Sequence, residues 1–161
     1  GQGTFDQCIR ALKRSALDEG IIRWIEQGKP YFGICLGLQV LFERSEEGEQ
    51  PGLAIFSGRV KRFSLPEGLK IPHMGWNAVD WKLLPEDPMK RDLANGDQFY
   101  FVHSYYAKLV HETEVVSSTG YGNMNFCSIL AKENLFATQF HLEKSGELGL
   151  KILRSFGDWN P

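Results

Sequence analysis

The stretch YFGICLGLQ, residues 31–39, joins a short apolar run to a turn with a glycine on each side of Cys35, and then to the start of a helix. A strand, G-x-C-x-G and a helix in this order form the pattern of a nucleophile elbow, with sulfur in place of serine oxygen. We expect glycine to be required at positions 33 and 37, because side chains there would clash in so tight a turn. The turn should lift Cys35 above the carboxyl edge of a sheet. There the N–H groups of the following helix would lower the pKa of its thiol.

A nucleophilic cysteine needs a base, and the candidate is His141, which ends an apolar run that starts at residue 135. Glu143 lies two residues further on and would point to the same side in an extended segment. Its carboxylate could hold one imidazole nitrogen while the other faces Cys35, as in a nucleophile–His–acid triad. Taken separately, Cys35 could be a buried small hydrophobe and the His–Glu pair a surface feature. Their combination favours the triad.

Helical periodicity precedes the elbow. Residues 5–27 carry apolar residues at helical spacing, and Asp6 and Asp18 are candidate N-caps that would divide the segment into two helices. Gly28 and Pro30 should end the second helix. Helix, buried strand, tight turn and helix in succession are typical of an α/β sheet.

Strand-like segments dominate the rest of the chain. A helix is expected over residues 36–42, and residues 58–122 contain short strand-like pieces broken by Pro and Gly. Strands at residues 126–131 and 135–140 follow, and then a closing helix capped by Ser145. The sequence therefore predicts an α/β fold with a mainly parallel sheet flanked by helices, flavodoxin-like, with an antiparallel excursion in the middle.

The composition is that of an ordinary globular protein, and we expect one domain over residues 1–161, with 42% hydrophobic and 24% charged residues. The formal net charge of −2 gives no electrostatic reason to expect nucleic acid or an anionic membrane, and no apolar run is long enough to cross a bilayer. Three cysteines do not make a disulfide framework, which favours a reducing, cytoplasmic location. Because the sequence opens at Gly1 without a methionine or a signal peptide, we expect the domain to be incomplete at its N-terminus.

The remaining histidines and cysteines are weaker candidates. We expect His73 to lie in a loop and His111 to be solvated, whereas His103 follows a strand-like run and could approach the same sheet edge as the elbow. Cys8 and Cys127 fall in apolar patterns and should belong to the core. No pair has the spacing of a metal site, so neither a metal nor a cofactor is predicted.

Several of these segments resemble known signatures. GICLGLQ at residues 33–39 and QFHLE at residues 139–143 resemble the two signatures of class I, triad-type glutamine amidotransferases. PHMGWN at 72–77, YFVHSY at 100–105 and EKS at 143–145 are similar to the glutaminase subunits of imidazole glycerol phosphate synthases. The resemblance extends from the first residue to the closing helix and implies the class I glutamine amidotransferase fold. PHMGWN is its most subunit-specific element.

The resemblance also implies a reaction. Cys35 would attack the side-chain amide of L-glutamine, His141 would protonate the leaving ammonia and then activate water, and Glu143 would orient His141. The ammonia would pass through a tunnel to a (βα)₈-barrel cyclase subunit, which forms a heterodimer with this chain and makes imidazole glycerol phosphate in histidine biosynthesis. Three alternatives remain: a glutaminase domain that feeds another synthase, a related cysteine hydrolase, and a non-catalytic fragment that only binds the barrel partner.

The resemblance further implies roles for residues around the nucleophile. Positions that hold glutamine in the family match Gln39, Glu47, Ser104 and Tyr105. The glycine-rich strand that forms the oxyanion hole matches Gly1 and Gly3, together with the N–H of Leu36. The subunit interface matches Trp76, Tyr100 and Lys144, although Trp76 and Tyr100 could instead be ordinary core residues.

Three features depart from the family pattern. The strand, helix and strand that normally precede the equivalent of Gly1 are absent from the sequence. Gln2 stands where a small apolar residue is usual. Leu142 stands where proline is usual, which should loosen the backbone between His141 and Glu143.

Overall fold

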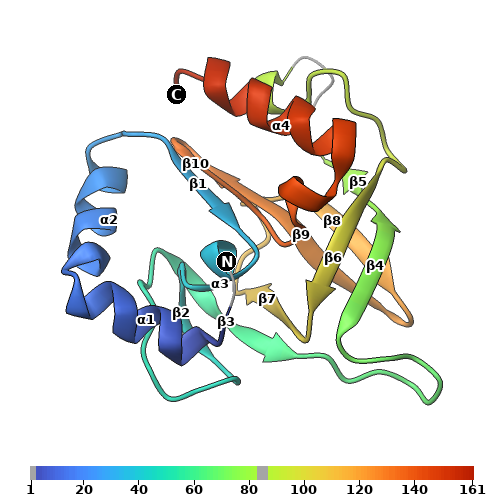
Figure 1. Cartoon of the computed structure of the whole chain (residues 1–161), viewed down its shortest axis with the longest axis horizontal. Helices are drawn as coiled ribbons and strands as arrows, with labels where there is room; N and C mark the ends of the chain where they lie inside the picture. Colours follow the sequence, from blue (N-terminus) through green and yellow to red (C-terminus); the bar gives the residue numbers. More distant parts are fainter. Residues whose placement is uncertain (1–2, 83–86) are drawn as a thin grey trace.

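The computed structural model describes residues 3–82 and 87–161, which form a five-stranded sheet, two smaller sheets and the helices around them (Figure 1). The five-stranded sheet has the order β1-β10-β9-β8-β5, with β1 Tyr31–Ile34, β5 Asp80–Trp81, β8 Val115–Tyr121, β9 Met124–Lys132 and β10 Leu135–Thr138. The three-stranded sheet contains β2 Phe42–Ser45, β3 Phe56–Arg62 and β7 Tyr105–Leu109, and the two-stranded sheet contains β4 His73–Ala78 and β6 Gln98–His103. The helices are α1 Phe5–Arg14, α2 Leu17–Glu26, α3 Leu36–Gln39 and α4 Gly146–Asp158, with 3₁₀ turns η1 Pro88–Lys90 and η2 Leu142–Lys144.

The strands pair in both directions. β1 pairs with β10 in parallel, as does β2 with β3, but the other pairs of named strands in the described ranges are antiparallel. The cause lies in the connections, because the two-residue turns at 122–123 and 133–134 join β8 to β9 and β9 to β10, and so short a turn links antiparallel neighbours. The predicted α/β class is confirmed, whereas the predicted predominance of parallel pairs is wrong.

The N-terminal segment forms two helices, as predicted, but its caps differ from the prediction. Thr4 caps α1 in a reciprocal capping box with Gln7. Asp6 lies inside the first turn, where its carboxylate accepts from the backbone N–H groups of residues 49–50. Asp18 also lies inside a first turn, that of α2, where an acidic side chain favours the positive end of the helix dipole. None of the helices in the described ranges is long and apolar enough to cross a membrane.

The helix after the elbow is shorter than predicted. It ends at Gln39, and Phe42 already belongs to β2. Leu41 and Phe42 are both fully buried, and Phe42 lies opposite Phe56 of β3, with ring centroids 5.9 Å apart. Leu41 lies in the turn between α3 and β2, and Phe42 is buried at the first position of the strand. A turn and a strand therefore bury this apolar pair where a continued helix was predicted.

Aromatic side chains fix the sheet against α4. The rings of Phe99 and Phe140 stack with centroids 4.2 Å apart, and Phe136 packs into the same cluster. On β1, the ring of Phe32 stacks on that of Phe156 of α4, with centroids 4.7 Å apart. Phe99, Phe136 and Phe140 are fully buried, and each such burial stabilises the fold by about 1.5–3 kcal/mol. The partly buried pair Phe32 and Phe156 packs α4 against β1. Figure 1 shows α1 and α2 at the opposite end of the molecule from β4 and β6.

The elbow has the strained backbone of a nucleophile turn. Cys35 has φ 52° and ψ −103°, a conformation that non-glycine residues rarely adopt. A Cβ on Gly33 would lie 2.6 Å from the Gly37 carbonyl oxygen and 3.1 Å from Cβ of Ala137, so glycine is required there. A Cβ on Gly37 would meet only the Tyr31 hydroxyl, at 3.8 Å, so the predicted clash at that position is wrong.

Replacing Gly33 and Gly37 separately by alanine should therefore have unequal effects. Gly33→Ala should lower the free energy of unfolding by about 1–3 kcal/mol, because backbone on one side and a buried strand on the other leave no room. Gly37→Ala should change it by less than about 1 kcal/mol, in the stabilising direction if helix propensity dominates. Urea denaturation of both variants tests this, and equal losses would contradict the steric role of Gly33.

Candidate active site

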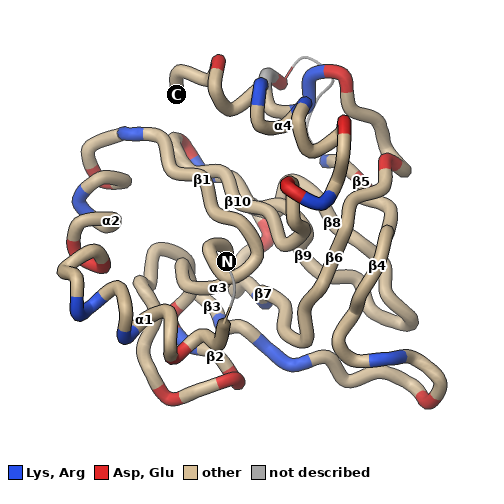
Figure 2. Tube along the Cα trace, viewed as in Figure 1, with Lys and Arg blue, Asp and Glu red and all other residues tan. Residues whose placement is uncertain are grey.

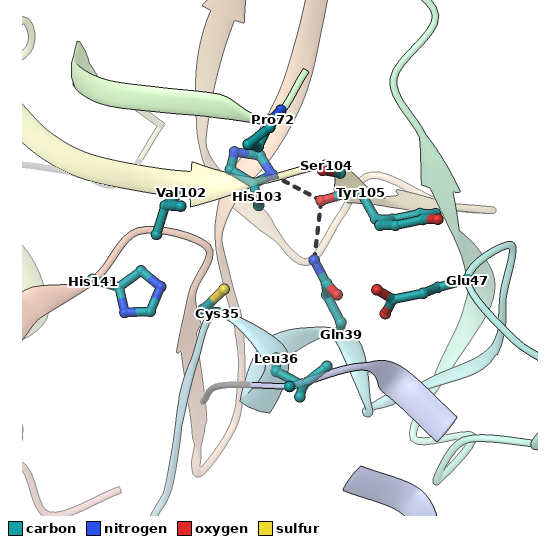
Figure 3. Close-up of a pocket in the computed structure, with 11 residues that line it drawn as sticks. Cys35, Leu36, Gln39, Glu47, Pro72, Val102, His103, Ser104, Tyr105 and His141 are labelled. Carbon is teal, nitrogen blue, oxygen red and sulfur yellow. Dashed lines mark hydrogen bonds between the residues drawn. The ribbon is translucent and has the colours of Figure 1, made fainter. Parts of the chain in front are cut away.

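The parallel pairing of β1 with β10 brings Cys35 next to the residues that follow β10. Ile34 lies opposite Thr138, and the Cys35 N–H donates to the Thr138 carbonyl at 2.7 Å. Three residues later the His141 N–H donates to the Tyr100 carbonyl of β6 at 2.9 Å. Cys35 and His141 are 8% and 2% exposed, and Figure 3 shows the imidazole beside the sulfur at one end of a pocket. The structure thus unites two segments that are far apart in the sequence.

Glu143 orients the imidazole of His141. The His141 Nδ1 and Glu143 Oε1 atoms are 2.6 Å apart, and since a carboxylate only accepts, Nδ1 donates. The segment is not extended as predicted, because the 3₁₀ turn η2 starts at Leu142, which is 2% exposed. Partial burial raises the pKa of Glu143, but the hydrogen bond from His141 and the attraction of its charged form outweigh burial, and the net pKa is below its ordinary value. Glu143 is therefore ionised at neutral pH.

Ser145 holds the backbone on which His141 is mounted. Its hydroxyl donates to the His141 carbonyl at 2.6 Å and accepts from the Tyr100 N–H at 3.0 Å. Ser145 precedes α4 as predicted, but its side chain does not cap that helix. Instead of capping the helix, the Ser145 hydroxyl makes two hydrogen bonds that connect the backbone of His141 to β6.

The thiol of Cys35 does not have the lowered pKa that the sequence suggested. Burial raises its pKa, and hydrogen bonds from the Leu36 amide and the Gln139 side chain offset this only in part. The following helix has just four residues, too few for the aligned dipole that the prediction assumed. Cys35 is therefore a neutral thiol at neutral pH, and a thiolate there would require proton transfer to a neighbouring base.

A pocket of about 270 Å³ opens beside Cys35 and His141 (Figure 3). This volume is slightly below the range of about 300–1,000 Å³ found for drug-sized ligands and suits an amino acid. Glu47 is the one formally charged side chain of its described lining, and its Oε2 accepts from the Phe5 N–H at 2.8 Å. Of the residues predicted around the nucleophile, the pocket is lined by Gly3, Leu36, Gln39, Glu47, Ser104 and Tyr105. Gly1 and Gln2 lie outside the described residues.

Gln139 is a site residue for which the sequence suggested no role. It is fully buried, and its Nε2 donates to the Cys35 sulfur at 3.6 Å. Its Oε1 accepts from Gln39 Nε2 at 3.1 Å, and the same Gln39 nitrogen donates to the Tyr105 carbonyl at 3.0 Å. The available signal was an amide side chain inside the largely apolar run 135–140, two residues before His141.

The other histidines fall into three environments. His103 lines the pocket, as its position after a strand suggested, and His111 is exposed as predicted. His73, predicted in a loop, is instead a buried member of β4, because it pairs with His103 across the ladder. Cys127 belongs to the core, and Cys8 packs against it. Within residues 3–82 and 87–161, no group of three His, Cys, Asp or Glu side chains is placed to hold a metal ion.

The three residues matched to a subunit interface lie together on one surface. Trp76 is 54% exposed, so the alternative that it is an ordinary core residue is wrong. Tyr100 is half-buried and lies opposite Trp76 in the β4–β6 ladder, with their rings edge to face at 6.0 Å. Lys144 Nζ lies 5.6 Å from the centroid of the Tyr100 ring. We call Met74, Trp76, Tyr100 and Lys144 the β4–β6 surface; Met74 is 60% exposed.

Comparison with known proteins identifies the class. The chain matches the class-I glutamine amidotransferase family over residues 12–158. The crystal structure of a glutamine amidotransferase has the same fold, with a TM-score of 0.62 at 17% identity over 92% of this chain and 72% of that one. A glutamine amidotransferase from Thermotoga maritima gives a TM-score of 0.62 at 14% identity over 98% of this chain and 60% of that one. The chain belongs to the class-I glutamine amidotransferase family, and the fold predicted by resemblance is confirmed.

Relatives of higher identity narrow this to one branch of the family. Imidazole glycerol phosphate synthase subunit HisH of Gloeobacter violaceus is 46% identical over 97% of this chain and 69% of that protein. The subunits of the same name from Thermosynechococcus vestitus and Neisseria meningitidis serogroup B are 48% and 44% identical, over 97% and 99% of this chain and 74% and 76% of those proteins. The chain falls in this HisH branch, and the predicted enzyme class is confirmed.

The raised pKa of Cys35 predicts the pH dependence of its alkylation. Since the thiolate is the reactive form, reaction with iodoacetamide without substrate should be slow at neutral pH and rise with pH beyond the ordinary thiol value of about 8.5. Mass spectrometry of the Cys35 peptide measures the rate, and Cys35→Ala gives the background from the other two cysteines. A thiolate that titrates below about pH 7 would contradict the dominance of burial.

Proposed function

We propose that this chain hydrolyses L-glutamine to glutamate and ammonia through a Cys35–His141–Glu143 triad, as a glutaminase subunit in histidine biosynthesis. The ammonia passes to a (βα)₈-barrel cyclase subunit, which uses it to make imidazole glycerol phosphate. The proposal rests chiefly on the 2.6 Å contact between His141 Nδ1 and Glu143 Oε1. This contact leaves Nε2 as the basic nitrogen of a neutral imidazole, and the ring lies beside a buried cysteine in a pocket of amino-acid size (Figure 3). Three free cysteines suit a reducing compartment, so we place the reaction in the cytoplasm.

The pocket suits the two ends of glutamine. Glu47 carries the charge that an α-ammonium group requires, and its carboxylate is fixed by the bond from the Phe5 N–H. Ser104 and Tyr105 lie across the pocket from Leu36, as Figure 3 shows. The side chain of the bound glutamine would lie between them and Leu36. Gln39 would line the path between them. The side-chain amide of glutamine would then lie next to Cys35, at the end of the pocket that His141 lines.

The first half of the reaction forms a thioester. His141 Nε2 takes the proton of the Cys35 thiol as the sulfur attacks the amide carbon, and the negative charge moves to the amide oxygen. The N–H of Leu36 and the glycine segment at Gly3 stabilise this oxyanion, a contribution that is typically about 2.7–4 kcal/mol for one donor. His141 then donates its proton to the amide nitrogen, the C–N bond breaks, and ammonia leaves with Cys35 acylated.

The second half releases glutamate. Neutral His141 removes a proton from water, the resulting hydroxide attacks the thioester carbon, and the C–S bond breaks. The proton on His141 returns to the Cys35 sulfur, which restores the neutral thiol favoured by its burial. Glu143 stabilises the imidazolium in both halves without taking the proton itself.

The β4–β6 surface is the proposed docking site of the cyclase. Its exposed Trp, Met and Lys side chains surround a half-buried Tyr, and Trp, Tyr and Met are enriched in the centres of protein interfaces. Tyr100 also bonds the backbone of His141, so this surface adjoins the point at which ammonia is released. Elsewhere along the described chain, charged residues of both signs are interspersed around the outside (Figure 2).

The triad is tested by removing its nucleophile. Cys35→Ala should abolish glutamine hydrolysis with the fold retained, whereas Cys127→Ala, a buried cysteine outside the pocket, should keep most of the activity. Glutamate release by the full chain, with and without the cyclase, measures this. A diazo-ketone analogue of glutamine should modify Cys35 alone and be blocked by excess glutamine. Hydrolysis by Cys35→Ala at the unmodified rate would contradict the triad.

The docking surface is tested with a matched pair of tryptophans. Trp76→Ala should weaken binding of the barrel cyclase by about 2 kcal/mol or more, the usual size of a tryptophan hot spot, or roughly 30-fold in Kd. Trp24 of α2 is similarly exposed, at 46% against 54% for Trp76, and lies at the other end of the molecule. Trp24→Ala should leave Kd unchanged. Titration calorimetry that gives equal affinities for both variants would reject this surface.

A further inference from the structure

We propose that His73 and His103 are positioning residues for the nucleophile: together they form part of a hydrogen-bond chain that links Asn77 of β4 to the sulfur of Cys35, with the Tyr105 carbonyl accepting from both sides. The chain crosses from the β4–β6 ladder to the elbow through side chains and one carbonyl. Its effect on turnover rests on the proposed glutaminase function, whereas its hydrogen-bond directions can be tested without that function.

The direction of the chain is fixed at its start. Asn77 Oδ1 accepts from the Ala78 N–H at 2.8 Å, so the Nδ2 group is the donating end of this side chain. It donates to the Gly120 carbonyl at 2.9 Å and to His73 Nε2 at 3.1 Å. His73 Nε2 is therefore an acceptor, and in the neutral ring the proton lies on Nδ1.

The two histidines pass this direction on. His73 Nδ1 donates to His103 Nε2 at 3.0 Å, which places the His103 proton on Nδ1. That N–H donates to the Tyr105 carbonyl at 2.8 Å. Each ring uses one donor and one acceptor, so the arrangement requires both to be neutral. Burial lowers the pKa of His103 to about 3 and that of His73 to about 4, so both are neutral at pH 7.

The Tyr105 carbonyl is the junction between the histidines and the nucleophile. It also accepts from Gln39 Nε2 at 3.0 Å, and Figure 3 shows both bonds meeting at this oxygen. The Gln39 amide is thereby fixed with its nitrogen toward Gln139 Oε1, at 3.1 Å. Gln139 must then present its own nitrogen to Cys35 Sγ, at 3.6 Å. A flip of either glutamine amide would break two of these bonds.

The surroundings of the histidines indicate that their polarity is used. Rings of Phe63, Phe101, Tyr121 and Phe126 lie 4.1–6.3 Å from the imidazole rings. Apolar side chains would pack among these aromatic rings without the free-energy cost of burying four imidazole nitrogens. What the histidines add is a donor to the carbonyl that orients Gln39.

The kinetic test compares variants of His103 in the full chain with its cyclase. His103→Leu removes the donor, His103→Asn keeps an N–H near the position of Nδ1, and His111→Leu alters an exposed histidine as the control. We expect His103→Leu to lower kcat by ~10-fold or more per mole of Cys35 that the diazo-ketone analogue can label, which corrects for unfolded enzyme. His103→Asn should restore kcat to within ~3-fold of the parent, and His111→Leu should match the parent.

A double-mutant cycle separates positioning from general loosening of the fold. If His103 acts through Gln139, the double variant His103→Leu/Gln139→Leu should be no slower than the slower single variant, since both break one chain. If the kcat losses of the two single variants multiply in the double variant, or if His103→Leu keeps the parental kcat, the proposal is overturned.

The second test needs neither a variant nor turnover. In the ¹⁵N-labelled chain, the imidazole nitrogens of His73 and His103 should show the Nδ1–H tautomer in both rings at neutral pH. An Nε2–H tautomer or a charged ring at either position would overturn the chain of bonds. An unmodified chain that shows both Nδ1–H tautomers but does not hydrolyse glutamine would count against the proposed function. In that case the rate of Cys35 alkylation in His103→Leu, relative to His111→Leu, decides the positioning role; equal rates reject it.

Discussion

The hydrogen bond from the Cys35 amide to the Thr138 carbonyl, 2.7 Å long, extends the parallel ladder of β1 and β10 to the point where both strands end. Because the strands run side by side in register, the residues after them emerge together, and one carries the thiol and the other the imidazole. The ladder is secured from both faces. Phe32 and Phe136 stack on each other in the aromatic cluster next to α4, and Leu135 and Ala137 pack into the other core cluster. A shift of one residue would reverse these faces and separate Cys35 from His141.

The site couples a buried nucleophile to a half-exposed acid. Cys35 and His141 are almost fully buried, whereas the Glu143 side chain is 53% exposed and so retains part of its hydration while it bonds to the imidazole. This arrangement keeps the charged member near water and the nucleophile away from it. Burial raises the pKa of Cys35 and so favours the neutral thiol. In the proposed reaction the thiolate would form at neutral pH when His141 accepts the proton as the sulfur attacks the substrate.

How far the sequence predicts this protein differs between local and non-local features. The apolar run predicts the strand Tyr31–Ile34, and helical periodicity with an internal cap predicts two helices before it. The cap at Thr4 is a local capping box with Gln7, whereas the short α3 depends on contacts made elsewhere. The antiparallel pairing of β9 with β10 could have been predicted from the sequence, because a turn of only two residues joins them. The roles of Gln139 and His73 could not be found from spacing, because each depends on a partner far along the chain. Gln139 and Cys35 are 104 positions apart, and His73 and His103 are 30 positions apart. The pKa of Cys35 was misjudged because the sequence shows the helix but not the burial.

The strands β4 and β6 connect the proposed partner surface to both halves of the site. On β4, Met74 and Trp76 face outward, while His73 and Asn77 alternate with them and face the interior, as the period of a strand requires. On β6, the backbone of Tyr100 bonds His141 on its carbonyl and Ser145 on its amide. The ladder is therefore linked to His141 through the backbone and to Cys35 through the histidine pair. Both connections begin at the two strands that carry the proposed partner surface.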